Sequence, residues 1–283
     1  MSFIETHLVE PEQAKPLVAV KEAFRALKNG GNYTLKMIAF CGVVLGVIFW
    51  IPERFAVSGT GLSAGQVLVE AVFAFYWHRF FLLNEAELSG GDFRPFMMRS
   101  LFYYLIFGLT FLIGIGVFIG LTGNLSDVQI TALLLFCAMA SLFALPRVGL
   151  VFPAIAVDNP ARSMADAFVL SSGNASRLAV GYFLMLIAVL VMMMPLIAMT
   201  FFVEEHRPEL VIADTYLILS NLFYGLAGAV TILLWAGLNS SFYRQLGGDI
   251  HPTTDLGADG ELNDNECDSD GPSSAGYGDR KGG

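Results

Sequence analysis

Long apolar stretches alternate with short polar or charged stretches along most of this chain. A helix that crosses the hydrocarbon core of a bilayer needs about 20 mainly apolar residues. Windows of that length predict six membrane spans. They cover residues 33–51, 64–83, 101–121, 128–145, 178–203 and 215–238. The predicted fold class is therefore all-α, a polytopic transmembrane helical bundle of about six spans.

Two shorter segments have the pattern of amphipathic helices that lie at a membrane surface. Residues 16–31 place apolar side chains on one helical face and basic side chains on the other. The apolar ones are Leu17, Val20, Phe24 and Leu27, and the basic ones are Lys21, Arg25 and Lys28. In the second segment, residues 163–174, Ser163 and Asp166 have the spacing of a capping box. We expect an interfacial helix in each segment.

The same two regions also resemble each other in sequence. Each has Ala-Phe, then Gly-Asn, then a basic residue before a long apolar stretch, so that Ala23 matches Ala167 and Gly31 matches Gly173. One interpretation is an ancient parallel duplication. The other is that surface helices preceding membrane spans converge on such a pattern.

Composition supports a membrane protein with a separate tail. The chain is 55% hydrophobic and 14% charged, which is too apolar for an ordinary soluble domain. Of the net charge of −9, residues 249–283 carry −7. Because this tail has few large apolar residues, it cannot offset the entropy of ordering its backbone. We predict a cytoplasmic N-terminal segment at 1–32, a membrane domain at 33–247 and a disordered acidic cytoplasmic tail at 248–283.

The distribution of Lys and Arg predicts the orientation, because basic loops stay in the cytoplasm. With the N-terminus inside, fourteen of the sixteen Lys and Arg residues fall on the cytoplasmic side, and only Arg54 and Arg207 fall outside. Both termini are then cytoplasmic. Cys41 and Cys137 lie in predicted spans and Cys267 in the tail, so neither a disulfide framework nor a cysteine metal site is expected. We expect no metal or other cofactor.

Four polar residues are candidates for function. Glu70, with Gln66 one turn earlier, lies about two turns inside the second span, where an ionisable group is costly. The pair could line a polar cavity, relay a proton or hydrogen-bond a neighbouring helix. Arg147 belongs to a segment, 146–160, in which Pro146, Pro153 and Pro160 are spaced seven residues apart, and which either turns along the interface or continues span four with a kink. A hinge that moves during transport is the more specific interpretation of this segment.

His78 and Arg79 are the other two candidates, and they sit in the aromatic stretch AFYWHRFFLLNEAE at residues 74–87. The stretch ends the second span, so its aromatic rings are expected at the inner interface and Arg79 is expected to snorkel toward lipid phosphates. A binding role for the pair is the alternative.

Two motifs that suggest catalysis or calcium binding lack the neighbouring features that those functions require. GLSAG at 61–65 matches the GxSxG pattern of serine hydrolases but follows no strand. ECDSDG at 266–271 resembles the start of a calcium loop, yet Tyr277 stands where the bidentate glutamate is required. The pairs Gly42/Gly46 and Gly116/Gly120 have GxxxG spacing, which allows close helix packing. We expect no catalytic residue and no enzymatic activity.

The stretches WHRFFLLNE and PRVGLVFPAIAVDN, followed by DAFVLSSGN, resemble a family of uncharacterised bacterial six-helix membrane proteins. That family looks related to the membrane domain fused to some glycerophosphoryl diester phosphodiesterases. The resemblance covers nearly the whole membrane body and implies a bacterial inner-membrane location. The catalytic domain has no counterpart here, so the phosphodiesterase activity does not carry over.

Two functions remain open from the sequence. The favoured one is a non-enzymatic inner-membrane protein that scaffolds a partner or contacts lipid headgroups through its basic face. The alternative is a small secondary transporter or permease that uses Glu70 and residues 146–160. The expected partners are the bilayer and either another membrane protein or a second copy of the chain, with no nucleic acid.

Overall fold

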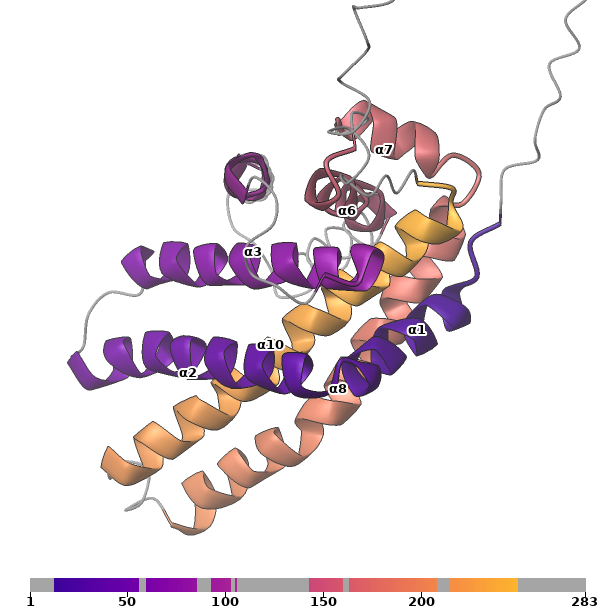
Figure 1. Ribbon diagram of the computed structural model, residues 1–283. Coiled ribbons are helices and arrows are strands. Elements are labelled where there is room, and N and C mark those ends of the chain that lie inside the picture. The colour runs from indigo at the N-terminus through magenta and orange to yellow at the C-terminus, as the bar shows by residue number, and fades with distance from the viewer. Residues whose placement is uncertain are drawn as a thin grey trace, which may run out of the picture. The chain divides into compact units, whose positions relative to one another are not determined.

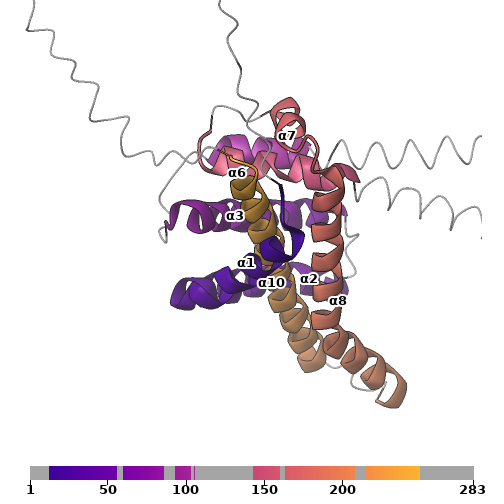
Figure 2. The same ribbon diagram turned by 90° about the vertical axis from the view of Figure 1, so that its right-hand side faces the viewer.

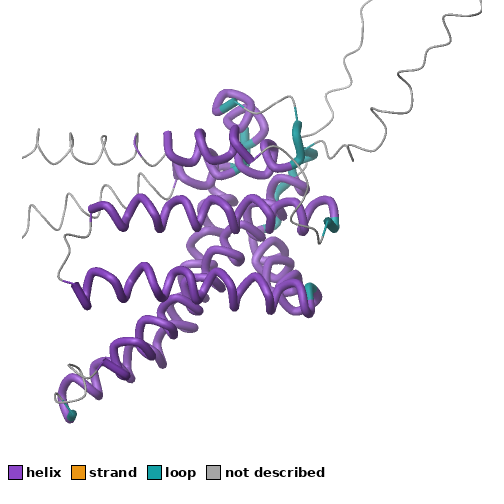
Figure 3. The backbone as a smooth tube through the Cα atoms, turned by 60° about the vertical axis from the view of Figure 1, so that its left-hand side comes forward, coloured by secondary structure: helices purple, strands orange, loops and turns teal. Residues whose placement is uncertain are grey.

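The computed structural model describes residues 13–55, 60–85, 93–102, 105, 143–159, 163–207 and 214–248. Within these ranges every regular element is a helix, as Figure 3 shows. The described residues all belong to one compact unit within residues 1–251. The predicted all-helical class is therefore confirmed for the described part of the chain.

The following helices carry labels in Figure 1. They are α1 (Pro16–Asn29), α2 (Gly31–Phe55), α3 (Thr60–Leu83), α6 (Val151–Ala156), α7 (Met164–Leu170), α8 (Ala175–His206) and α10 (Asp214–Gln245). Residues 93–102 and 143–149 are helical as well.

Four of the helices are long and apolar enough to cross a membrane. Their candidate spans are Gly31–Ile51, Gly65–Leu83, Ala175–Val203 and Asp214–Gln245, which match the first, second, fifth and sixth spans expected from the sequence. The third and fourth expected spans lie mainly in residues 106–142, outside the described residues. Gly116 and Gly120, Pro160, the calcium-like motif and residues 249–283 of the predicted tail also lie outside the described residues.

Helix α10 is the centre of the described bundle. It packs against α1, α2, α3, α6 and α8. Against α2 it approaches to backbone contact, because a Cβ atom on Gly225 would collide with the backbone of Gly42 and Gly46. Small residues that let two helix backbones meet are the usual packing device inside membranes. This GxxxG pair therefore serves a contact within the chain.

Helix α1 lies against α8 and α10 (Figure 2), where it buries small residues and leaves part of its apolar face exposed. The buried residues are Ala19, Val20 and Ala23, whereas Leu17 and Phe24 are 56% and 40% exposed. Small residues are buried because α10 comes close here: a Cβ on Gly237 would lie 3.2 Å from the Cβ of Ala23. The large apolar side chains of α1 are therefore left on the outside of the bundle.

The proline-containing segment from residue 143 is helical, and protein encloses its second half. Residues 143–149 are helical, a turn follows at Leu150, and α6 continues to Ala156. Every residue of α6 except Phe152 is buried, and the helix packs on α3 and α10. Residues 150–156 thus belong to the core of the described bundle, and the helix that precedes them ends at the turn at Leu150.

The two regions that resemble each other in sequence also share a local geometry. In each, a short helix (α1 or α7) is followed by a glycine with positive φ and then by a long apolar helix (α2 or α8). The glycines are Gly31 at φ 48° and Gly173 at φ 74°, a backbone conformation that favours glycine. The match between these positions therefore has a conformational basis, although α1 is twice as long as α7.

Candidate functional site

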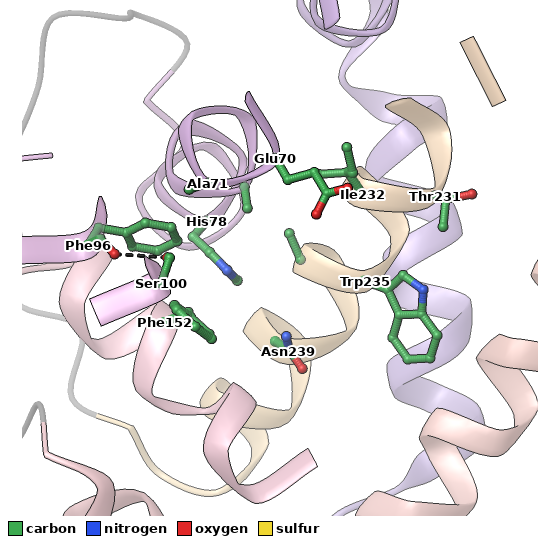
Figure 4. A pocket seen from close by; sticks show the side chains of 12 residues that line it. Glu70, Ala71, His78, Phe96, Ser100, Phe152, Thr231, Ile232, Trp235 and Asn239 are labelled. Atoms are coloured by element: carbon green, nitrogen blue, oxygen red, sulfur yellow. Dashed lines mark hydrogen bonds between the residues drawn. The ribbon is translucent and has the colours of Figure 1, made fainter. Parts of the chain in front are cut away.

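A cavity of about 280 Å³ lies between α3 and α10, with residues 93–102 and α6 forming its other walls (Figure 4). Glu70, Ala71, Ala74 and His78 line it from α3; Phe96 and Ser100 from 93–102; Phe152 from α6; and Thr231, Ile232, Trp235, Ala236 and Asn239 from α10. Two of the four residues singled out from the sequence, Glu70 and His78, thus share one cavity.

Helical spacing explains why these residues meet. Glu70, Ala74 and His78 recur every four residues on α3, and Thr231, Trp235 and Asn239 do so on α10, so each set follows one face of its helix. Empty space remains because Ala74 and Ala236 have small side chains, while the Phe96 and Phe152 rings form an aromatic wall. The cavity walls are therefore mainly apolar, with polar groups at a few places, as in most ligand sites.

Glu70 is held by the glutamine one turn before it. The Nε2 of Gln66 donates a hydrogen bond to Oε1 of Glu70 over 2.8 Å. Figure 4 shows the carboxylate directed toward α10. Of the two residues, Glu70 lines the cavity, and the hydrogen bond from Gln66 orients its carboxylate there.

His78 is 1% exposed and lies two turns further along α3. Its Nδ1 and the Oγ of Ser240 on α10 are 2.7 Å apart, within hydrogen-bond distance. This contact ties the two helices together and leaves Nε2 as the ring nitrogen that a molecule in the cavity can reach. His78 therefore serves both the helix contact and the cavity lining.

Asn239 is a site residue that the sequence analysis missed. The Tyr182 hydroxyl on α8 donates a short hydrogen bond to its Oδ1, and a Cβ on Gly149 would collide with that hydroxyl and crowd the carboxamide. The predicted span ended at Leu238, whereas α10 continues to Gln245. A polar Asn-Ser-Ser sequence directly after an apolar stretch was the available signal, since polar residues within spans mark sites.

Arg79 does not reach lipid, which corrects the expectation that it snorkels. Only 3% of the residue is exposed. Its Nη1 donates to the carbonyl oxygen of Ala156 over 2.8 Å, and Nε and Nη2 both contact Oε2 of Glu85, at 2.8 and 2.6 Å. Asp158 is a longer ion-pair partner at 3.6 Å. Arg79 thus joins the end of α3 to the end of α6, because buried charge needs partners.

The aromatic residues around Arg79 are also in the protein core, not at a lipid boundary. Phe75 and Trp77 are 1% and 0% exposed. Phe75 packs edge-on against Phe96 at 5.2 Å between ring centroids, and Trp77 packs on Phe80 at 5.1 Å. The expectation that these rings form an interfacial belt is wrong for both residues, because neighbouring helices cover them.

Arg147 lies away from the cavity and stabilises the end of α7. Its Nε donates to the Oγ of Ser171 over 2.9 Å and its guanidinium lies 4.5 Å from the centre of the Phe168 ring. The carbonyl oxygens at a helix C-terminus carry partial negative charge, which a cation complements. This local role accounts for the geometry of Arg147.

A second, more polar cleft lies where α1 and the C-terminal ends of α3 and α10 meet. Glu22, Arg25, Ala26, Asn29, Phe80, Phe81, Asn84 and Arg244 line it. Arg244 pairs with Glu22 at 2.9 Å and lies over the Phe81 ring. Arg25 is exposed. The cleft thus combines two cations, one carboxylate and two aromatic rings.

No family model, curated protein or solved structure matches this chain. Among the described residues, no group of three or more His, Cys, Asp or Glu side chains could hold a metal ion. The cavity and the second cleft are thus two candidate sites within the described residues.

Proposed function

We propose that this chain is a small secondary transporter or permease of the bacterial inner membrane, with six spans and both termini in the cytoplasm. A small solute would bind in the cavity between α3 and α10 on its way across the bilayer. The observation that carries the proposal is a cavity of about 280 Å³ that places Glu70 and His78 on one helix and Asn239 on the facing one.

Polar groups inside a span raise the free energy of the protein unless they have partners or a purpose. Helix contacts explain part of this set, since His78 bonds Ser240 and Asn239 bonds Tyr182. Gln66 likewise donates to Glu70. These contacts do not require Glu70, His78 and Asn239 to line one cavity, as they do here. A polar solute in the cavity could contact all three residues, and for this reason we favour transport over a purely scaffolding role.

Osmotic swelling of proteoliposomes containing the full-length chain tests this proposal with a panel of chemically different solutes. Small amines, alcohols and carboxylates would be applied one at a time, and light scattering would report influx. We expect faster swelling than in empty liposomes for at least one solute. Ala74→Leu, which fills the cavity, should return that rate to background.

Ala198→Leu on the exposed side of α8 is the matched control and should swell like wild type. Melting temperatures of both variants show whether they fold. The proposal fails if wild-type liposomes behave like empty ones with every solute, or if filling the cavity leaves influx unchanged.

A lipid-contacting role is the second candidate, supported by the cleft that contains Arg25 and Arg244. Exposed Leu17 and Phe24 on the adjacent α1 would insert among acyl chains, as in an amphipathic interfacial helix. Native mass spectrometry of the protein with phosphatidylglycerol bound tests it. Arg25→Gln should reduce the lipid-bound fraction, and Lys36→Gln on α2 serves as a charge-matched control.

A further inference from the structure

Glu70 is the only charged side chain among the described residues that line the cavity between α3 and α10. Gln66 holds its carboxylate, and apolar side chains of α3 and α10 lie beside it. Glu70 is half-buried, and a carboxylate beside apolar walls attracts a cationic group in preference to a neutral or anionic one. The Glu70 end of the cavity therefore selects positive charge.

The other end of the cavity offers neutral hydrogen-bonding groups. His78 follows Glu70 by eight residues, which corresponds to about 12 Å along a helix. Because Nδ1 of His78 contacts Ser240, Nε2 is the other ring nitrogen to which a ligand could hydrogen-bond. The Nδ2 of Asn239 can donate, because its Oδ1 is the atom that accepts from Tyr182. A hydroxyl or amide group fits this end.

Between the two ends the walls are mainly hydrocarbon. Ala74 and Ala236 line the space from opposite helices, and the Phe96 and Phe152 rings close another side. The hydroxyls of Ser100 and Thr231, which also line the cavity, donate to carbonyl oxygens of their own helices. Such walls provide few partners for a polar group in the middle of a ligand, and burial of a polar group without a partner is costly. The cavity therefore has an acidic end, an apolar middle and a neutral polar end.

We infer that this cavity binds a protonated amine whose far end carries a neutral hydrogen-bonding group, with a short hydrocarbon chain between them. This inference rests on the proposed function, since it names the class of solute for the same cavity. A bare divalent ion fits poorly, because Ca²⁺ takes six to eight oxygen ligands and Mg²⁺ requires an octahedral set. The described lining contains a single carboxylate.

Four probes of similar length separate the contributions of charge and hydroxyl. Aminohexanol has both the ammonium and the hydroxyl, hexanediol lacks the charge, hydroxyhexanoate reverses it, and hexylamine lacks the hydroxyl. Affinities would be measured by calorimetry on the full-length protein in lipid nanodiscs at neutral pH. We expect aminohexanol to bind at least about tenfold more tightly than hexanediol or hydroxyhexanoate, because a hydrogen bond to a charged group is stronger than a neutral one.

Glu70→Gln keeps the shape of the side chain and should abolish the tenfold preference for the amine. Asn239→Leu should keep that preference but lose the gain of about fivefold that the hydroxyl gives aminohexanol over hexylamine. If either variant fails to fold, Gln66→Leu provides a second readout, because releasing the carboxylate should weaken the preference for the amine.

Equal binding of hexanediol and aminohexanol overturns the inference, and so does an unchanged preference in Glu70→Gln. If Ala74→Leu then abolishes binding of both probes, the cavity still binds solutes and the proposed function stands. If none of the four probes binds, the inference is overturned, and the swelling assay decides the fate of the proposed function separately.

Discussion

Helix α10 presents small residues to two neighbouring helices, but it packs closely on only one of them. Toward α2, Gly225 meets the backbone of Gly42 and Gly46, and the two helices touch. Toward α3, Ala236 faces Ala71 and Ala74, and a cavity remains. The first contact behaves as small residues usually do in membranes, where they bring helices together.

Large side chains beside the alanines explain the difference. Trp235 and Phe152 stand next to the cavity and pack on other parts of the bundle, Trp235 on Tyr182 at 4.9 Å and Phe152 on Phe96 at 5.3 Å. These pairs keep α3 and α10 from closing over the alanines. A small residue therefore closes an interface only where its neighbours allow contact, and otherwise it creates space.

Gly225→Ala should have the largest effect, because it disrupts the close contact between α2 and α10. The added Cβ would lie within van der Waals radii of backbone atoms of α2, which cannot turn aside as a side chain can. We expect a loss of about 3 kcal/mol in the free energy of unfolding, at the upper end for overpacking. Unfolding of the purified protein by denaturing detergent measures it.

Gly228→Ala is the control on the same helix. Its Cβ would lie 3.4 Å from the Leu45 Cδ1, an ordinary contact, so the free energy of unfolding should change by less than about 0.5 kcal/mol. Equal stability of the two variants would show that α2 and α10 do not meet at Gly225.

Arg79→Met should have the next largest effect and act on the walls of the cavity between α3 and α10. The substitution removes the cation that joins α3 to α6, and these two helices form two walls of the cavity. Glu85 and Asp158 then lose their ion pair with Arg79. Loss of one partner from a buried ion pair costs about 3–5 kcal/mol. Because these carboxylates are 35% and 29% exposed, we expect about 2 kcal/mol here.

Detergent unfolding again measures the change, and affinity for aminohexanol should fall with it because the cavity walls separate. Arg94→Met, on the helix at 93–102, removes an equal charge without touching this ion pair. If Arg79→Met retains wild-type stability, the partners seen here do not hold α3 to α6.

The sequence marked one side of the α2–α10 interface but did not locate the cavity between α3 and α10. Hydropathy located four spans, and the spacing of Gly42 and Gly46 marked a contact surface without naming its partner. The cavity depends on which face of α3 meets which face of α10. Glu70 was recognisable from its position within a span, but Asn239 lies far from it along the chain, so the sequence did not show that both line one cavity.

Hydropathy also misled where polar groups find partners inside protein. It ends the last span at Leu238, yet Ser240 contacts His78 and Ser241 donates to Glu22, so α10 continues. The assignment of Arg79 to lipid phosphates fails for the same reason. Sequence alone does not distinguish lipid, water and protein as the partner of a charge near the end of a span.

The smallest effect should come from α7, which takes part in neither interface and so sets the scale of a local change. Ser163 and Asp166 form the expected capping box, with Oγ of Ser163 accepting from the Asp166 backbone N–H and Asp166 accepting from the Ser163 backbone N–H over 2.9 Å. Ser163→Ala should cost about 1 kcal/mol. The melting temperature would fall slightly, while affinity for aminohexanol should stay unchanged.

The pH dependence of this cap has a definite sign. Hydrogen bonds from the Ser163 hydroxyl and then its backbone N–H hold the pKa of the Asp166 carboxyl below the ordinary value of 3.8. Its contribution to stability is therefore present above the ordinary pKa and is lost as the pH falls through the lowered one. Wild type should melt higher than Asp166→Asn at neutral pH, and the gap should close in acid. A gap that stays constant or widens in acid would contradict the cap, since a protonated Asp166 accepts these hydrogen bonds no better than asparagine.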